Sequence, residues 1–175
     1  VRRRGTPRRR LRGGGRDAML PWLALAAGVI VLDQGTKAWV MAAFAPGEVL
    51  PVTGFFDLVL VFNSGAAFSF LAGAGGWQRW FFVLLALGIS AWIAAMLRRH
   101  PEARLQSLAL ALVMGGALGN VVDRLRFGAV ADFLSFHAAG WYWPAFNVAD
   151  SAISVGVALL VWLQLFQKSP EKLHD

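Results

Sequence analysis

The chain of 175 residues contains no cysteine, and only 15% of its residues are charged. The absence of cysteine excludes disulfide bonds, c-type haem attachment, cysteine-ligated metal and lipid modification on a cysteine of the chain itself. The scarcity of charge is typical of membrane proteins, because soluble domains are roughly 25% charged and about 45–50% apolar. With 57% hydrophobic residues, the composition predicts a protein that is buried largely in lipid.

The positive net charge of +7 is concentrated at one end of the chain. Eight of the 17 lysines and arginines lie within the first sixteen positions, in a stretch rich in arginine and glycine that has no apolar periodicity. Such a composition favours disorder. We interpret residues 1–17 as a basic cytoplasmic tail beside anionic lipid, rather than as a segment that binds nucleic acid.

Four segments are apolar enough to cross the hydrocarbon core as helices, which takes about 20 residues. The first follows basic residues and could instead be a cleavable signal peptide. Its apolar pattern continues past Asp33, however, and this favours a retained span. The sequence therefore predicts an all-α integral membrane protein with four transmembrane helices. They cover residues 19–44, 80–97, 105–122 and 151–167.

The connecting segments predict the orientation of the spans. Lysine and arginine are enriched on short cytoplasmic segments of membrane proteins, and here they gather in the first tail, in the link 98–104 and after residue 167. Both termini are therefore expected in the cytoplasm. We divide the chain into the tail 1–17, a four-helix membrane domain 18–168 and a C-terminal cytoplasmic tail 169–175.

The two longer connections, 45–79 and 123–150, are expected on the outer side of the membrane. The first contains FFDLVLVF at 55–62, whose β-branched and aromatic residues end at a turn-like Asn-Ser-Gly and predict a short strand or hairpin. The second contains WYWP at 141–144, which is typical of an aromatic anchor at the membrane interface. The outer side thus carries a small β-containing loop region.

Polar side chains from three predicted spans fall at one depth in the bilayer. At about 1.5 Å per helical residue, Asp33 lies roughly 20 Å above the cytoplasmic end of the first span. By the same rise, Asn120 lies about 24 Å and Asp150 about 27 Å above the cytoplasmic ends of the third and fourth spans. Charged groups inside spans usually face a bundle interior or a wet cavity. This layer near the outer interface is therefore the candidate site.

Other polar residues share helix faces with these three, because residues three or four apart lie on one face. Gly115 and Gly119 form a GxxxG pair one turn below Asn120, which allows another helix to approach closely. The groups at this spacing are Asp33 and Lys37; Asn120, Asp123 and Arg124; and Asn147 and Asp150.

Each polar residue also has a purely structural interpretation. Asn147 and Asp150 could be N-cap residues of the fourth helix, since both residue types accept hydrogen bonds from free backbone N–H groups. Asp132 lies in a predicted outer loop, where a solvated carboxylate is the default, and Asn63 fits a turn. His137 has no partner at metal-ligand spacing, so we expect no metal site.

The charged pairs of the spans could be structural as well. Asp33 and Lys37 could form an ion pair that only fixes the first helix. Asp123 and Arg124 could end the third helix and anchor it at the interface. Taken singly, these interpretations compete well with a functional one, but the shared depth of all the residues favours a site.

The polar residues lie within four blocks of sequence. The blocks are DQGTK (33–37), FNSGAAFSF (62–70), GGALGNVVDRLRFGAVADF (115–133) and FNVADSA (146–152). In this order and at this spacing, across residues 19 to about 167, they resemble the lipoprotein signal peptidases, the bacterial signal peptidase II family of integral membrane aspartic proteases. The third block, which combines GN, DR and VADF, is the most specific.

The resemblance implies that Asp132 and Asp150, from the two Val-Ala-Asp triplets, are the catalytic pair of a membrane-embedded aspartic endopeptidase. It implies a prolipoprotein substrate that bears a diacylglyceryl cysteine and is cut just before that cysteine, which frees the signal peptide. The enzyme would lie in the bacterial cytoplasmic (inner) membrane, with its site near the outer face and no metal or organic cofactor. We expect a monomer in membrane lipid. The residues implied to bind substrate or support the site are Asp33, Lys37, Asn63, Asn120, Asp123, Arg124 and Asn147.

The chemistry of two adjacent carboxylates agrees with that implication. Both cannot ionise comfortably, so one pKa rises and the pair shares a proton. The ionised member can take a proton from water while the protonated member polarises the scissile carbonyl. Their titrations belong to the pair, and the sequence does not assign the two roles.

Two non-proteolytic functions fit parts of the pattern. A small ion-coupled transporter could use Asp33, Asp132 and Asp150 as a proton relay, but the layer lies to one side of the membrane and the sequence has no inverted repeat. A scaffold protein would use the same residues only as helix caps and ion pairs.

A serine protease with a Ser–Lys dyad is a further alternative, with Lys37 as the base. The serines that would have to reach it are Ser64, Ser69 and Ser151. Asp33 lies one turn from Lys37 and would hold the lysine in its charged form, which argues against this chemistry.

Overall fold

The computed structural model describes residues 14–65 and 70–166. Within these residues, four helices are long and apolar enough to cross a membrane, and a small antiparallel sheet joins them, which confirms the predicted fold class. Most of the predicted tails 1–17 and 169–175 lies outside the described residues, as does Ser69. The elements are α1 (Gly14–Ala43), β1 (Val49–Pro51), β2 (Phe56–Asn63), α2 (Trp77–Arg99), α3 (Arg104–Phe127), β3 (Val130–Ala138), β4 (Trp141–Tyr142) and α4 (Val148–Phe166).

The predicted spans agree with the helices to within three residues, except that α1 begins five residues earlier, at Gly14, and α3 ends five residues later. α3 continues past residue 122 to Phe127, because Asp123 and Arg124 lie inside the protein rather than at its edge. The helix ends at Gly128, whose φ of 79° is left-handed and whose N–H donates to the Arg124 carbonyl at 3.1 Å. A glycine in this conformation is a common helix C-cap.

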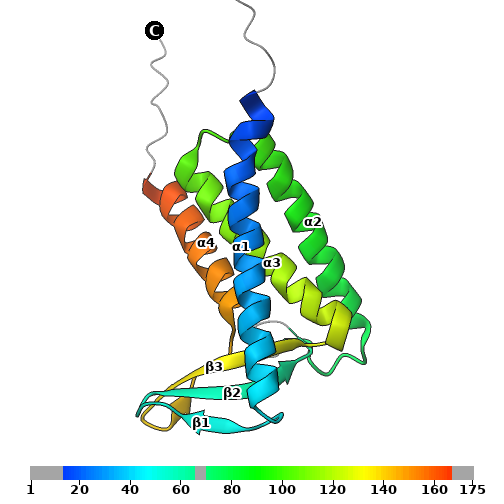
Figure 1. Ribbon diagram of the computed structural model, residues 1–175, viewed down its shortest axis with the longest axis vertical. Helices are drawn as coiled ribbons and strands as arrows, with labels where there is room; N and C mark the ends of the chain where they lie inside the picture. Colours follow the sequence, from blue (N-terminus) through cyan, green and yellow to red (C-terminus); the bar gives the residue numbers. More distant parts are fainter. Residues whose placement is uncertain (1–13, 66–69, 167–175) are drawn as a thin grey trace, which may run out of the picture.

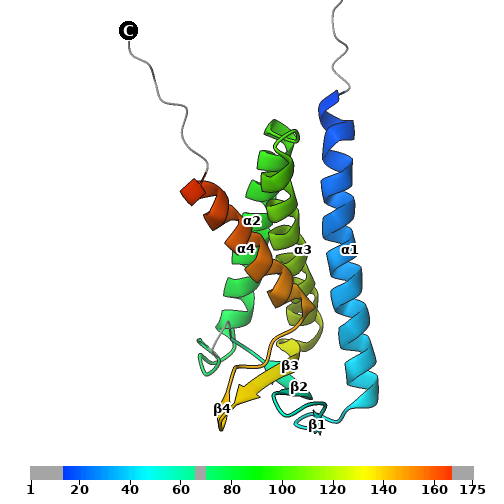
Figure 2. The same cartoon turned by 90° about the vertical axis from the view of Figure 1, so that its left-hand side faces the viewer.

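α3 is the central helix of the bundle. About 56% of its membrane span is buried, against 17–22% for the other three spans of the described chain. α1, α2 and α4 all pack against it, and Figure 2 shows α1 on one side of α3, with α4 crossing the other side. The remaining faces of α1, α2 and α4 are apolar and exposed, as lipid-facing surfaces are.

Glycines allow these helices to approach closely. A Cβ atom added at Gly115 would lie 2.7 Å from the Ala26 carbonyl oxygen of α1, and one at Gly119 would lie 2.8 Å from the Asp33 carboxylate. On α4, a Cβ at Gly156 would lie 2.6 Å from the Ala109 carbonyl oxygen of α3. The close approach predicted from the GxxxG pair is confirmed, and it brings the polar side chains of α1 and α3 into contact.

The sheet covers the end of the bundle that is opposite the start of α1 and the end of α4 (Figure 1). Its strands run antiparallel in the order β1-β2-β3-β4, and β2 confirms the strand predicted at 55–62. Across the β2–β3 ladder, Val61 pairs with Asp132 and Asn63 pairs with Val130. The sheet therefore carries Asn63 and Asp132 side by side toward the helix ends.

The prediction that Asp132 lies in a loop was wrong, because β3 occupies that part of the sequence. Side chains alternate between the two faces of a strand. Ala131 and Phe133 pack with Val40 of α1 on one face, while Asp132 between them lines a cavity on the other. β3 was missed because both of its faces are covered, so its first half lacks the polar–apolar alternation that marks a half-exposed strand.

The closest helix contact gives a stability prediction. A Cβ at Gly116 would overlap the Ala149 carbonyl oxygen of α4 and lie 2.8 Å from Ile153 Cγ1. We expect Gly116→Ala to lower the free energy of unfolding by about 1–3 kcal/mol, as overpacking does. Thermal unfolding in detergent measures this. The control is Gly88→Ala in α2, where a Cβ has no neighbour within 4 Å. Equal melting temperatures for both variants would contradict the packing described for α3 and α4.

Candidate active site

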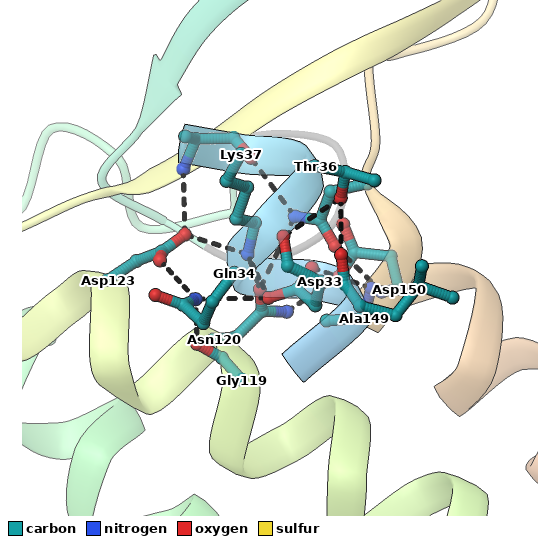
Figure 3. Close-up of polar contacts among 12 residues, drawn as sticks. Asp33, Gln34, Thr36, Lys37, Gly119, Asn120, Asp123, Ala149 and Asp150 are labelled. Carbon is teal, nitrogen blue, oxygen red and sulfur yellow. Dashed lines mark hydrogen bonds and ion pairs between the residues drawn. The ribbon is translucent and has the colours of Figure 1, made fainter. Parts of the chain in front are cut away.

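The polar layer is built around the buried ammonium group of Lys37 in α1 (Figure 3). Its Nζ lies 2.8 Å from an Asp33 carboxylate oxygen and 2.7 Å from an Asp123 carboxylate oxygen. It also donates to Asn120 Oδ1 at 3.0 Å. An ammonium has three N–H donors, and these three acceptors match them. The predicted Asp33–Lys37 pair is confirmed, and the structure adds Asp123 to it as a second carboxylate.

The two carboxylates beside Lys37 hold the backbone of the two Val-Ala-Asp triplets. Asp33 Oδ1 accepts the N–H of Ala149 at 2.9 Å, and Asp123 Oδ2 accepts the N–H of Ala131 at 3.1 Å. In each triplet, the alanine N–H is fixed by a buried carboxylate and the next side chain is an aspartate of the cavity. The two triplets thus share one kind of environment although they lie on different elements.

Gln34 joins these carboxylates and was not among the predicted site residues. Its side-chain amide donates to Asp123 Oδ1 at 2.8 Å, to Asp33 Oδ2 at 3.1 Å and to the Gly119 carbonyl at 3.2 Å. Helical spacing did not single it out, because Gln34 is not at i+3 or i+4 from Asp33. A glutamine next to a buried aspartate in a membrane span is the cue that could have found it.

Two asparagines hold the aspartates of the cavity. Asn120 donates from Nδ2 to Asp150 Oδ1 at 2.8 Å, and Asn147 donates from Nδ2 to Asp132 Oδ1 at 2.7 Å. Asn147 Nδ2 also lies 3.3 Å from Asn120 Oδ1, so the two amides are in contact. The side chains of Asp132 and Asp150 are thus tied to one another through two neighbouring amide groups.

Asn147 is also the N-cap of α4, as its structural interpretation predicted. Its Oδ1 accepts the backbone N–H of Asp150 at 2.9 Å, which is the usual cap contact to the third helical residue. Asp150 itself does not cap the helix in the same way, because its carboxylate faces Asn120. Asn147 therefore makes two contacts at once: its oxygen caps α4 while its NH₂ group donates to Asp132.

Asp132 and Asp150 both line a cavity of about 760 Å³. Its polar end is formed by these aspartates with Asn63, Asn120 and Arg124. Asp33, Lys37 and Asp123 lie behind this wall and are fully or almost fully buried. The apolar walls come from the facing sides of three helices, and the side chains that form them include Phe82, Leu85, Ile89, Val113 and Ile153.

Burial, followed by the nearby charge of Asp150, raises the pKa of the Asp132 carboxyl group, which lies on β3 outside the membrane spans, to about 7. Hydrogen bonds from Asn147 and Asn63 and the charge of Lys37 act against the rise. A carboxyl group that binds a proton near neutral pH can act as a general acid.

Arg124 and Asn63 connect this end of the cavity to the segment after β2. Arg124 donates from Nη2 to the Gly65 carbonyl at 2.7 Å, and its guanidinium group lies 5.0 Å from the centre of the Phe82 ring. Asn63 Oδ1 accepts the Gly65 N–H at 2.9 Å, which confirms the predicted turn. The sequence did not predict that Phe82 and Leu85 line the cavity. The reason is that α2 carries no polar residue at that depth to mark its face as part of the site.

The contacts of Lys37 argue against a Ser–Lys dyad. A lysine that acts as a base must be neutral, whereas Lys37 is enclosed by two carboxylates that favour its charged form. The Ser151 hydroxyl donates to the Asn147 carbonyl at 2.9 Å, and the Ser64 hydroxyl donates to the Ala72 carbonyl at 2.8 Å. Both serines are thus bonded to backbone oxygens.

Comparisons with known proteins identify the family of this chain. A family model described as signal peptidase (SPase) II matches residues 25–166. A lipoprotein signal peptidase of Azoarcus sp. (strain BH72) is 64% identical over 148 residues, which cover 85% of this chain and 84% of that protein. A lipoprotein signal peptidase of Ralstonia nicotianae is 55% identical over 150 residues, which cover 86% of this chain and 87% of that protein.

Two solved structures share the fold. Both are described as bacterial membrane enzymes determined by the in meso method, at 2.3 and 1.9 Å resolution, and both are 28% identical to this chain. Their TM-scores are 0.78 and 0.73, and the matches cover 89% and 85% of this chain and 93% and 94% of those structures. The family resemblance of the four sequence blocks is thereby confirmed. The chain belongs to the signal peptidase II family and is a membrane-embedded aspartic-type peptidase.

Proposed function

We propose that Asp132 and Asp150 are the catalytic pair of this peptidase and that it removes the signal peptide from prolipoproteins. The observation that supports the pair best is its setting: both carboxylates line one cavity, and each accepts a hydrogen bond from its own asparagine. The charge of Asp150 contributes to the raised pKa of Asp132, as expected when two carboxylates share a proton.

The reaction then follows from one proton held between two carboxylates. The ionised carboxylate takes a proton from a water molecule as its oxygen attacks the scissile carbonyl carbon. The protonated carboxyl group donates its proton to the carbonyl oxygen, so that no free oxyanion forms. When the tetrahedral intermediate collapses, the C–N bond breaks and the leaving nitrogen takes a proton from the carboxyl group that received it from water. One hydroxyl group of the intermediate returns its proton to the other carboxylate as the new carbonyl forms. The pair returns to its singly protonated state.

The shape of the cavity fits a substrate that is partly in lipid. Its polar end holds the proposed pair, and its apolar walls on α2, α3 and α4 suit the apolar run of a signal peptide and the acyl chains of a diacylglyceryl cysteine. We place the scissile bond just before that cysteine. The names of the relatives as lipoprotein signal peptidases support this substrate class.

The charge distribution supports an orientation in the bacterial cytoplasmic membrane with both termini inside. The basic link between α2 and α3, at residues 98–104, lies at the same end of the bundle as the start of α1 (Figure 1). The excess of arginine at this end favours the cytoplasmic side. The sheet and the proposed pair are then near the outer face. We propose that residues 18–168 are the catalytic unit and act as a monomer in lipid, since the cavity lined by described residues is formed within one chain.

The proposed pair is tested by Asp132→Asn and Asp150→Asn, which keep the shape of each side chain and remove its acid–base chemistry. We expect each variant to lose about 10²-fold or more of its activity, the usual contribution of general acid–base catalysis. The measurement is cleavage of a diacylglyceryl-modified prolipoprotein by purified protein, with folding checked by thermal unfolding.

The matched control for this test is Asp57→Asn. Asp57 is also a buried carboxylate, but it is bonded to His137 at 3.2 Å on the sheet and does not line the cavity. The Asp57→Asn variant should keep most of the activity of the parent protein. If Asp132→Asn or Asp150→Asn keeps most of its activity while folded, the pair proposed here is wrong.

The raised pKa of Asp132 predicts how activity depends on pH. Below the pKa values of the pair both carboxyl groups are protonated and no base remains; above them both are ionised and no acid remains. Because the pKa of Asp132 is raised to about 7, we expect kcat/KM to fall as the pH rises from about 7 to 9. A steady-state pH profile measures this. Activity that stays constant up to pH 9 would contradict a proton shared at the pair.

A further inference from the structure

The contacts of Asn120 fix which way its amide group points. Lys37 Nζ lies 3.0 Å from the Asn120 amide atom on one side, and an Asp150 oxygen lies 2.8 Å from the amide atom on the other. An ammonium can only donate hydrogen bonds and an ionised carboxylate can only accept them. The oxygen of Asn120 must therefore face Lys37, and its NH₂ group must face Asp150. Lys37 itself does not line the cavity, and its hydrogen bond is relayed to Asp150 through Asn120.

The second asparagine is fixed in the same manner by a different group. The backbone N–H of Asp150 lies 2.9 Å from Asn147 Oδ1 and can only donate. The NH₂ group of Asn147 must therefore face Asp132, at 2.7 Å. This constraint comes from the backbone of α4, so no side-chain substitution removes it. The orientation of Asn120, in contrast, depends on side chains: Lys37 Nζ donates to its oxygen at 3.0 Å, and Asn147 Nδ2 makes a longer contact to the same oxygen at 3.3 Å.

We propose that Lys37 is a positioning residue for catalysis, because its ammonium group holds the Asn120 amide with the NH₂ group toward Asp150. This inference rests on the proposed function of Asp132 and Asp150. With Lys37 in place, each aspartate of the pair faces an amide donor, so the singly ionised state is favoured on both sides. Without it, the oxygen of Asn120 keeps only the longer contact from Asn147 Nδ2, at 3.3 Å. A turn of the amide that brings this oxygen toward Asp150 then favours a protonated Asp150 that can donate to it.

The charged and titratable groups around the pair come from four elements. Lys37 and Asp33 lie on α1, Asp123 and Arg124 on α3, and the pair itself lies on β3 and α4. Replacing Lys37 by methionine removes a positive charge and a fixed donor, and both changes strengthen the binding of a proton by the pair. The fall of activity at alkaline pH should therefore occur at a higher pH.

The first experiment is the pH profile of kcat/KM for Lys37→Met, whose side chain has a similar length and no charge. We expect the alkaline limb to move up by about 0.5–1 pH unit, less than the 1–3 units typical of a charge in direct contact. The infrared band of the protonated carboxyl group, identified by its loss in Asp132→Asn and Asp150→Asn, should persist to correspondingly higher pH. If Lys37 had a purely structural role, Lys37→Met would lower the yield of folded enzyme. The midpoint pH of the kcat/KM profile and that of the infrared band would then both stay unchanged.

A second variant keeps the test decisive if Lys37→Met does not fold. Lys37→Met combined with Asp33→Asn removes one positive and one negative charge together, and it leaves the net charge of the Asp33–Lys37–Asp123 cluster as it is in the parent protein. Any upward shift of the alkaline limb in this variant then arises from the orientation of Asn120. If the double variant folds and the alkaline midpoint of its kcat/KM profile equals that of the parent protein, the proposed orienting role of Lys37 is wrong. This holds even if Lys37→Met alone shifts that midpoint.

The matched control is Gln34→Met on the same helix. Gln34 contacts Asp33, Asp123 and the Gly119 carbonyl, but no contact joins its amide to Asn120 in the described part of the chain. This variant should lose stability and keep the parent midpoint; a shift equal to that of Lys37→Met would overturn the inference. Activity retained in Asp132→Asn or Asp150→Asn would instead overturn the proposed pair. The two failures are therefore distinguishable.

Discussion

The arrangement of this site depends on one buried ammonium group between two buried carboxylates. A charge removed from water is costly unless it is paired and hydrogen-bonded, and Lys37 meets that condition only when α1 and α3 are in a single register. The same two carboxylates also accept the backbone N–H groups of Ala131 and Ala149, which fixes the backbone in front of Asp132 on β3 and Asp150 on α4. Four elements that are far apart in the sequence are thereby held at one point, near the ends of the helices.

This polar cluster is enclosed by packing that only small residues permit. Gly115, Gly116 and Gly119 lie on faces of α3 that contact α1 and α4, and a Cβ at each would meet backbone or side-chain atoms of those helices. In lipid, helices associate through such close contacts and through polar side chains, because apolar surface alone gives them no reason to leave the lipid. The glycines and the buried charges therefore act together: the first allow the approach, and the second select its register.

The division of the polar residues into two groups follows from burial. Asp33, Lys37 and Asp123 lie behind the wall of the cavity and are saturated with partners, which suits a rigid support. Asp132 and Asp150 line the cavity, where water and a substrate can reach them. Asn120 lies between the two groups and joins Lys37 to Asp150, whereas Asn147 is oriented by the backbone of α4 and donates to Asp132. A peptidase of the signal peptidase II family thus obtains a fixed polar site within a largely apolar bundle, with no cysteine in the chain.

The sequence by itself determined the four spans, the strand β2, the Asp33–Lys37 pair and the depth at which the polar residues gather, because helical rise and hydrophobic length are local properties of the chain. It did not reveal β3, whose two covered faces hide the alternation of a strand, nor the role of Gln34, whose three partners lie on α1 and α3. Only the tertiary structure decided that Asp123 joins Lys37, that each Val-Ala-Asp triplet is held by its own carboxylate and that the apolar face of α2 lines the cavity. These features depend on the contact between helices, and the residues of one helix do not specify which atoms of another will face them.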